Sequence, residues 1–246
     1  MGEVIAVLSG KGGTGKTSVC AAMASALAQQ GEKVLCIDCS VGFPNLDICL
    51  GIDELAALSF LDICRGGYDL NQATQHPVYN NLYFFTAPVE SSAEEIDAEA
   101  FKDMLEKAKE QFSFVLLDGP AGADTLFHLT AEAADRVLVV TGFDPASVRS
   151  AAHVGEMLER MGKENVRIII NGISMKAMAG LKLTVDDIMD QAGLPLMGIV
   201  PEDPNVFLAA ASHKPLLAYT QKDAAAACKR IAVRLQGKPS PIPKKI

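Results

Sequence analysis

Residues 10–17 read Gly10-Lys11-Gly12-Gly13-Thr14-Gly15-Lys16-Thr17, which matches the pattern G-x-x-x-x-G-K-[ST] at every fixed position. An apolar run at 4–8 precedes the motif, and a helical pattern at 17–30 follows it. Glycines let the backbone curl until several N–H groups face one anion, and the start of a helix adds unpaired N–H groups. The motif and its context therefore predict a phosphate-binding loop that holds ATP or ADP with Mg²⁺.

Each part of this loop has an expected role. Lys16 should reach the β- and γ-phosphates, and the Thr17 hydroxyl should ligate Mg²⁺. Main-chain N–H groups of the loop and of the helix start should contact the phosphates. The expected nucleotide-binding residues of this segment are Gly10, Lys11, Gly12, Gly13, Thr14, Gly15, Lys16, Thr17 and Ser18.

Two carboxylates follow apolar strands elsewhere in the chain. Asp118 ends the run at 114–117, which is the Walker B pattern, and its carboxylate should hold the Mg²⁺ hydration shell. Asp38 ends the run at 34–37 and is a second candidate, placed near the metal or near the attacking water. Both residues are interpreted as metal-site residues because they accompany a phosphate-binding loop.

Apolar runs alternate with helical stretches along the chain. Most runs are continuous, as expected for parallel strands covered on both faces. The expected strands are 4–8, 34–37, 82–85, 114–117, 137–140, 166–170 and 197–200. The expected helices are 17–30, 93–111, 124–133, 146–161, 185–192 and 220–235. This alternation predicts one doubly wound α/β domain over 1–237, with a mostly parallel sheet flanked by helices and a flexible tail at 238–246.

Composition narrows the function classes. The 246 residues carry a formal net charge of −8, which argues against nucleic acid as a partner because phosphate contacts need clustered Lys and Arg. After Asp223 all charged residues are basic. We interpret them as a solvated face and tail, with a weak patch for anionic lipid or nucleic acid as the alternative.

We find no signal-peptide pattern and no run long enough to span a bilayer, so a cytoplasmic protein is expected.

The six cysteines are scattered, as is usual in a reducing compartment. Cys36 and Cys39 formally read C-x-x-C, but residues three apart on a strand point to opposite faces. We therefore expect small buried thiols there. The four histidines show no metal-site spacing.

Lys11 is an additional lysine, inside the loop and ahead of Lys16. The run at 11–17 is therefore the deviant Walker A motif, and it resembles the MinD/ParA/Mrp family of P-loop ATPases. The resemblance covers nearly the whole chain, and its later stretches favour the septum-site-determining MinD branch over chromosome-partition ParA proteins. The matching stretches are 37–38, 42–47, 70–73, 81–83, 118–122, 147–149 and 198–203.

The resemblance implies a slow, partner-stimulated ATPase that recruits partner proteins for spatial positioning. Lys11 would cross a homodimer interface to the partner's phosphates, so that ATP joins two subunits. Residues 39–47 would be switch I, and 119–123 would be switch II. The residues implied around adenine are Asn171, Pro201, Glu202 and Asp203, and the residues implied in catalysis are Lys11, Lys16 and Asp38.

Two departures from the family pattern bear on function. The family usually has Asp-x-Asp after the second strand, whereas this chain reads Asp38-Cys39-Ser40. A hydroxyl cannot accept a proton at neutral pH as a carboxylate can, so slow turnover is expected. The run at 238–246 is also broken by prolines and lacks the apolar face of a membrane-binding helix, which places membrane attachment by that route in doubt.

Three alternatives to the switch ATPase stay open at this stage. The Ser40 departure is compatible with an ATP-dependent dimeric scaffold that scarcely hydrolyses ATP. A related positioning or partition ATPase would share the loop and the dimer. A metabolic ligase or amidase can be built on the same fold, and it would turn over only with a small acid substrate.

Overall fold

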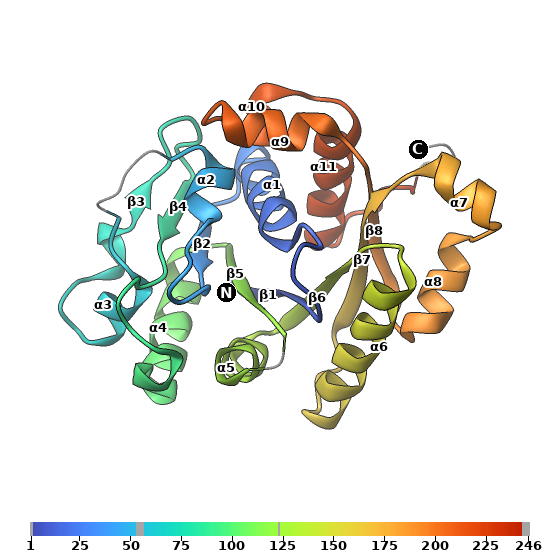
Figure 1. Ribbon diagram of the computed structural model, residues 1–246. Coiled ribbons are helices and arrows are strands. Elements are labelled where there is room, and N and C mark those ends of the chain that lie inside the picture. Colours follow the sequence, from blue (N-terminus) through green and yellow to red (C-terminus); the bar gives the residue numbers. More distant parts are fainter. Residues whose placement is uncertain (1, 53–56, 123, 243–246) are drawn as a thin grey trace.

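The computed structural model describes residues 2–52, 57–122 and 124–242. Within them lies an eight-stranded sheet with the order β3-β4-β2-β5-β1-β6-β7-β8, flanked by helices (Figure 1). All neighbouring strands are parallel except β3, which is antiparallel to β4. This is the predicted doubly wound, mostly parallel architecture.

The elements have the following bounds. The strands are β1 (Glu3–Ser9), β2 (Val34–Asp38), β3 (Thr74–Gln75), β4 (Leu82–Phe85), β5 (Phe114–Ala121), β6 (Arg136–Thr141), β7 (Val166–Ile173) and β8 (Leu196–Pro201). The α-helices are α1 (Lys16–Gln29), α2 (Leu46–Leu50), α3 (Phe60–Cys64), α4 (Ala98–Gln111), α5 (Thr125–Ala133), α6 (Pro145–Arg160), α7 (Met175–Leu181), α8 (Val185–Ala192), α9 (Pro204–Ala211), α10 (Leu216–Tyr219) and α11 (Asp223–Leu235). Two 3₁₀ turns, η1 (Leu70–Gln72) and η2 (Ala93–Glu95), complete the set.

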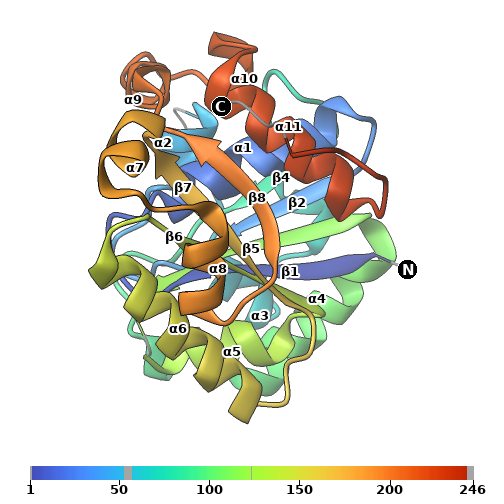
Figure 2. The same ribbon diagram turned by 90° about the vertical axis from the view of Figure 1, so that its right-hand side faces the viewer.

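Two hydrophobic cores fill the two faces of the sheet. One core joins the sheet to α1, α2, α9, α10 and α11, and the other joins it to α3, α4, α5, α6 and α8. Figures 1 and 2 show these helices as layers on opposite sides of the strands. Helix α1 is apolar around most of its circumference because it packs on the sheet, on α2 and on α11. The helix that follows the phosphate-binding loop is therefore fixed on nearly every side.

The seven predicted strands are confirmed, and most predicted helices are found with ends shifted by a few residues. The helix predicted at 93–111 is wrong in its first turn, because Asp97 accepts N–H bonds from Glu99 and Ala100 and so starts α4 anew after η2. The helix predicted at 220–235 begins at Asp223, since Thr220 is extended. Short elements that the pattern did not predict are α2, α3, α7, α9, α10 and β3.

Two smaller expectations concern the cysteines and the tail. Cys36 and Cys39 are fully buried free thiols, as predicted. Arg234 donates a hydrogen bond from Nε to the carbonyl oxygen of Ser240, so the first part of the tail contacts α11. The flexibility of 238–246 stays a prediction, and 243–246 lie outside the described residues.

The parallel strands bring their carboxyl ends to one edge of the sheet, where ligands bind in open α/β folds. Strand β1 is central, and it is followed directly by residues 10–15 and by α1. On the neighbouring strands β2 and β5, Asp38 lies opposite Asp118 in the register. The fold thus brings both predicted carboxylates beside the phosphate-binding loop.

Candidate nucleotide-binding site

The loop between β1 and α1 has the backbone geometry that its glycines permit. Gly13 and Gly15 have φ values of +81° and +80°, in the left-handed region that favours glycine. A Cβ atom at Gly15 would also lie 2.2 Å from the Nδ2 atom of Asn171. A side chain at this position would displace either the loop or Asn171, so glycine is required here.

Lys16 lies at the start of α1, with only 7% of its surface exposed. Its Nζ atom is 2.7 Å from Oδ1 of Asp118 and 3.4 Å from the hydroxyl of Thr17. The predicted phosphate-binding lysine therefore lies beside two of the three predicted metal-site residues, Thr17 and Asp118. In the structure, the Lys16 ammonium forms an ion pair with Asp118 there.

The Asp118 carboxylate is fully buried, and burial raises its pKa from 3.8 to about 6. The Lys16 ammonium opposes this rise in pKa, and the neighbouring Asp38 adds to it. The second oxygen, Oδ2, is buried and has no hydrogen-bond partner among the described residues. A buried carboxylate oxygen without a partner costs free energy, so this atom is suited to a cation or to metal-bound water.

These residues fit a Mg²⁺ ion that arrives with a nucleotide. Mg²⁺ in phosphate sites is held by one or two protein oxygens together with phosphate oxygens and water. Thr17 and Asp118 supply such oxygens beside Lys16, and no group that the structure describes bonds to Asp118 Oδ2. Within 2–52, 57–122 and 124–242, no three His, Cys, Asp or Glu side chains form a metal cage.

Asp38 is brought next to Asp118 but faces different groups. Its Oδ1 atom accepts a hydrogen bond from the N–H of Ser40, and its Oδ2 atom accepts bonds from the N–H groups of Asn45 and Leu46. Both oxygens of this fully buried carboxylate therefore hold the segment predicted as switch I. A direct role for Asp38 at the metal or at the attacking water stays a prediction.

The four residues implied around adenine come together beside the loop. A cavity of about 180 Å³ is lined by Asn171, Pro201, Glu202 and Asp203 together with Gly15 and Ser18. Its apolar wall was missed in the sequence and consists of Val19, Val200, Val206, Leu216, Ala224 and Cys228. These wall residues come from five separate elements, so no local pattern marks them as one surface.

Two polar side chains in this cavity already have structural partners. The Nδ2 atom of Asn171 donates to the carbonyl oxygen of Thr14 at 2.8 Å, which ties β7 to the loop. Asp203 caps α9 through the N–H of Asn205 and accepts a longer bond, 3.2 Å, from the N–H of Ala224 in α11. Asn171 therefore shapes the loop, and Asp203 fixes the two helices that wall the cavity.

Lys11 differs from Lys16 in its surroundings. Its side chain is 48% exposed, and its Nζ atom lies 3.5 Å from Oδ1 of Asp144. Asp144 caps α6 by accepting a bond from the N–H of Ser147. The two lysines of the motif therefore divide into one that is buried against Asp118 and one that stands at the surface.

The segment predicted as switch II is only partly described. Gly119 and Pro120 belong to β5, and the N–H of Gly122 donates to the carbonyl oxygen of Ser9 at 3.0 Å. Residue 123, at the end of this segment, lies outside the described residues. The segment thus begins at the Walker B strand and returns to the end of β1.

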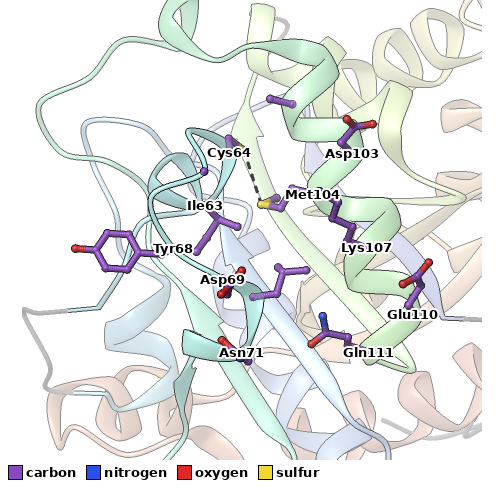
Figure 3. Close-up of a pocket in the computed structure, with 13 residues that line it drawn as sticks. Ile63, Cys64, Tyr68, Asp69, Asn71, Asp103, Met104, Lys107, Glu110 and Gln111 are labelled. Carbon is purple, nitrogen blue, oxygen red and sulfur yellow. Dashed lines mark hydrogen bonds between the residues drawn. The ribbon is translucent and has the colours of Figure 1, made fainter.

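A larger cavity, of about 570 Å³, lies between residues 63–71 and α4 (Figure 3). Its labelled rim includes Tyr68, Asp69, Asp103 and Glu110. None of the predicted site residues lines this cavity. The chemistry of the side chains, rather than the size of the cavity, therefore identifies the site at the sheet edge.

The fold and this edge define a P-loop nucleotide-binding protein. The chain belongs to the CobQ/CobB/MinD/ParA nucleotide-binding family, whose domain model matches residues 5–216. It is 31% identical over 246 residues to the septum site-determining protein MinD of Thermotoga maritima, with 98% of this chain and 91% of that protein covered. The family resemblance inferred from the motif is confirmed.

Solved structures agree with this assignment. The MinC:MinD cell division protein complex of Aquifex aeolicus matches with a TM-score of 0.90 and 31% identity, covering 98% of this chain and 99% of that one. The Pyrococcus horikoshii septum site-determining protein MinD complexed with Mg-ADP matches with a TM-score of 0.82 and 25% identity, covering 96% of each chain. Among the helices that the structure describes, none has the length and the hydrophobicity that a membrane-spanning helix needs.

Proposed function

We propose that this chain is a Mg²⁺-dependent ATPase switch of MinD type. It would alternate between a monomer and an ATP-joined homodimer, hydrolyse ATP slowly and recruit a partner protein while ATP is bound. The observation that carries the proposal is the buried Oδ2 atom of Asp118 beside Lys16 and Thr17, which has no hydrogen-bond partner in the described part of the chain. It supplies a metal-facing oxygen at the point where the loop would place the phosphates.

The residues at the carboxyl edge of the sheet have different roles in the proposed function. Lys16, which is paired with Asp118 in the structure, would bind the β- and γ-phosphates, so that one anionic partner replaces another. The ionised Asp118 and the Thr17 hydroxyl would hold the Mg²⁺ that accompanies ATP. This ion would neutralise charge on the phosphates during transfer. The cavity beside Asn171 receives the base between β8 and the start of α1.

The dimer proposal rests on the position of Lys11. Its side chain is half exposed, and within residues 2–52, 57–122 and 124–242 its ammonium group has a single ion-pair partner at 3.5 Å, the capping carboxylate of Asp144. Such an exposed pair contributes only about 0–1 kcal/mol, so Lys11 can exchange this partner for a phosphate of a second subunit. The similar structures support the nucleotide and the partner protein of the proposal, since one relative was solved with Mg-ADP and another with MinC.

Ser40 favours a second candidate, an ATP-joined dimer that acts as a scaffold and scarcely hydrolyses ATP. Its main-chain N–H is bound by Asp38, and its side chain offers a hydroxyl where the family usually carries a carboxylate. The two candidates share binding and dimerisation, and they differ only in turnover. A turnover rate measured on the dimer separates them.

The proposal is tested by calorimetric binding of Mg·ATP to the wild type and to the Lys16→Ala variant. Loss of a charge-assisted contact of about 1.5–3 kcal/mol predicts at least roughly tenfold weaker binding. Lys107→Ala is the matched control, because Lys107 lines the separate cavity beside α4. Equal affinity in the wild type and Lys16→Ala would show that the loop is not the nucleotide site.

A further inference from the structure

The Asp38 carboxylate caps the start of helix α2. Helix α2 begins at Leu46, and the side chain of its N-cap residue, Asn45, does not bond to the helix start. That side chain instead donates to the carbonyl oxygen of Phe43. The unpaired N–H groups at a helix start need an acceptor, and here the acceptor comes from the end of β2.

Asp38 supplies this acceptor from seven and eight residues away. Its Oδ2 atom lies 2.9 Å from the N atom of Asn45 and 3.0 Å from the N atom of Leu46. Its Oδ1 atom lies 2.8 Å from the N atom of Ser40. A single buried carboxylate therefore ties both ends of the segment 39–46 to the strand edge.

The neighbouring Asp118 shows the opposite arrangement, although the two residues are paired in the register of adjacent strands. Asp118 uses Oδ1 for the Lys16 ammonium and leaves Oδ2 buried without a partner among the described residues. Its main-chain carbonyl accepts a bond from the N–H of Cys39 at 3.0 Å. The two carboxylates thus face different groups. Asp118 faces Lys16, which follows the loop after β1, whereas Asp38 faces the segment that follows β2.

We propose that Asp38 is a positioning residue that holds residues 39–46 in place before nucleotide binds, while Asp118 and Thr17 face the metal. The segment then presents Ser40 to the nucleotide from a fixed position. Three main-chain N–H bonds to one buried carboxylate carry this assignment. It deepens the proposed function, because it separates the two carboxylates of the expected metal site.

Amide hydrogen exchange by NMR on the nucleotide-free full chain tests the anchoring. In the wild type, the amides of Ser40, Asn45 and Leu46 should exchange at least about tenfold more slowly than that of Val41, as expected for hydrogen bonds to a charged acceptor. The N–H of Val41 has no partner among the described residues. This comparison needs no variant, so it holds even if a substitution at Asp38 prevents folding.

The Asp38→Asn variant sharpens the test, with Asp118→Asn as the matched control. Asparagine offers one acceptor oxygen and one amino group. Either the N–H of Ser40 or the N–H groups of Asn45 and Leu46 would therefore face an amino group in place of an acceptor oxygen. Exchange of Ser40, or of Asn45 and Leu46, should accelerate about tenfold or more in Asp38→Asn, and it should stay unchanged in Asp118→Asn. Equal protection in the wild type and Asp38→Asn would overturn the proposal.

A second readout distinguishes positioning from metal binding. The Mg²⁺ concentration at half-maximal ATP binding should rise in Asp118→Asn and stay near the wild-type value in Asp38→Asn. An equal rise in both variants would make Asp38 a metal residue and contradict the assignment. If the wild type binds no Mg·ATP, the proposed function fails, whereas the exchange experiment still decides whether Asp38 anchors 39–46.

Discussion

The pKa of Asp118 leads to a quantitative prediction for the Asp118→Asn variant. Burial raises this pKa from 3.8 to about 6 in the folded chain. Because the folded pKa is raised, Asp118 contributes stability that is fully present below pH 3.8 and is lost as the pH rises through about 6. At about 1.4 kcal/mol per pKa unit, the shift corresponds to about 3 kcal/mol in total.

Only part of this range is accessible to measurement. Between about pH 4.5 and about pH 7.5, Asp118 should lower the free energy of unfolding by about 2 kcal/mol. Asparagine does not titrate, and the remaining ionisable groups occur in both proteins. The free energy of unfolding of Asp118→Asn, minus that of the wild type, should therefore increase by about 2 kcal/mol over this range.

Urea unfolding of the nucleotide-free chain in EDTA, at several pH values, measures this difference. A constant offset between the two proteins is expected, because Lys16 loses its partner at 2.7 Å in the variant. The slope with pH is the informative quantity. Asp124→Asn is the matched control, because Asp124 caps α5 without contacting Lys16. A difference that is flat or falls with rising pH would show that folding does not raise the pKa of Asp118.

Three further predictions follow from particular residues. Ser40→Asp should accelerate single-turnover hydrolysis of bound ATP, but by a smaller factor than full general-base assistance, which contributes about 10²–10⁴-fold. If the variant binds ATP and dimerises but hydrolyses ATP no faster, this prediction is wrong. Asn171→Ala should weaken ATP binding about fivefold in calorimetry, because Thr14 loses a bond at 2.8 Å; unaltered affinity would count against that role. Burial lowers the pKa of His76 from 6.5, so the stability that the neutral imidazole contributes is present above pH 6.5 and is lost as the pH falls. In urea unfolding, the free energy of unfolding of His76→Gln should therefore fall less toward acid pH than that of the wild type. An equal fall in both proteins would contradict this prediction.

The phosphate-binding loop could be predicted from the sequence because its constraints are local. Gly13 and Gly15 adopt positive φ values within the motif itself, and Lys16 and Thr17 follow at once in α1. Asp118 was predictable for a similar reason, since it ends a continuous apolar strand. In each case, a short stretch of chain contains both the residue and the reason for its position.

Features that depend on distant partners could not be predicted in this way. The apolar wall of the cavity beside Asn171 combines Val206 of α9 with Leu216 of α10 and Cys228 of α11. The role of Asp38 as an anchor depends on the position of α2, a helix of five residues that the periodicity did not reveal. The break before α4 depends on the capping by Asp97, whose acidic side chain resembles others in a helical pattern.

The proposed dimer consists of two copies of this chain that ATP joins through Lys11. Its most direct test is the mass of the protein by light scattering, with no nucleotide, with Mg·ADP and with Mg·ATP, for the wild type and for Lys11→Ala. A dimer of the wild type is expected with Mg·ATP alone, together with a monomeric Lys11→Ala variant that retains most of its ATP affinity. A monomer of the wild type under all three conditions, or normal ATP-dependent dimers of Lys11→Ala, would contradict it.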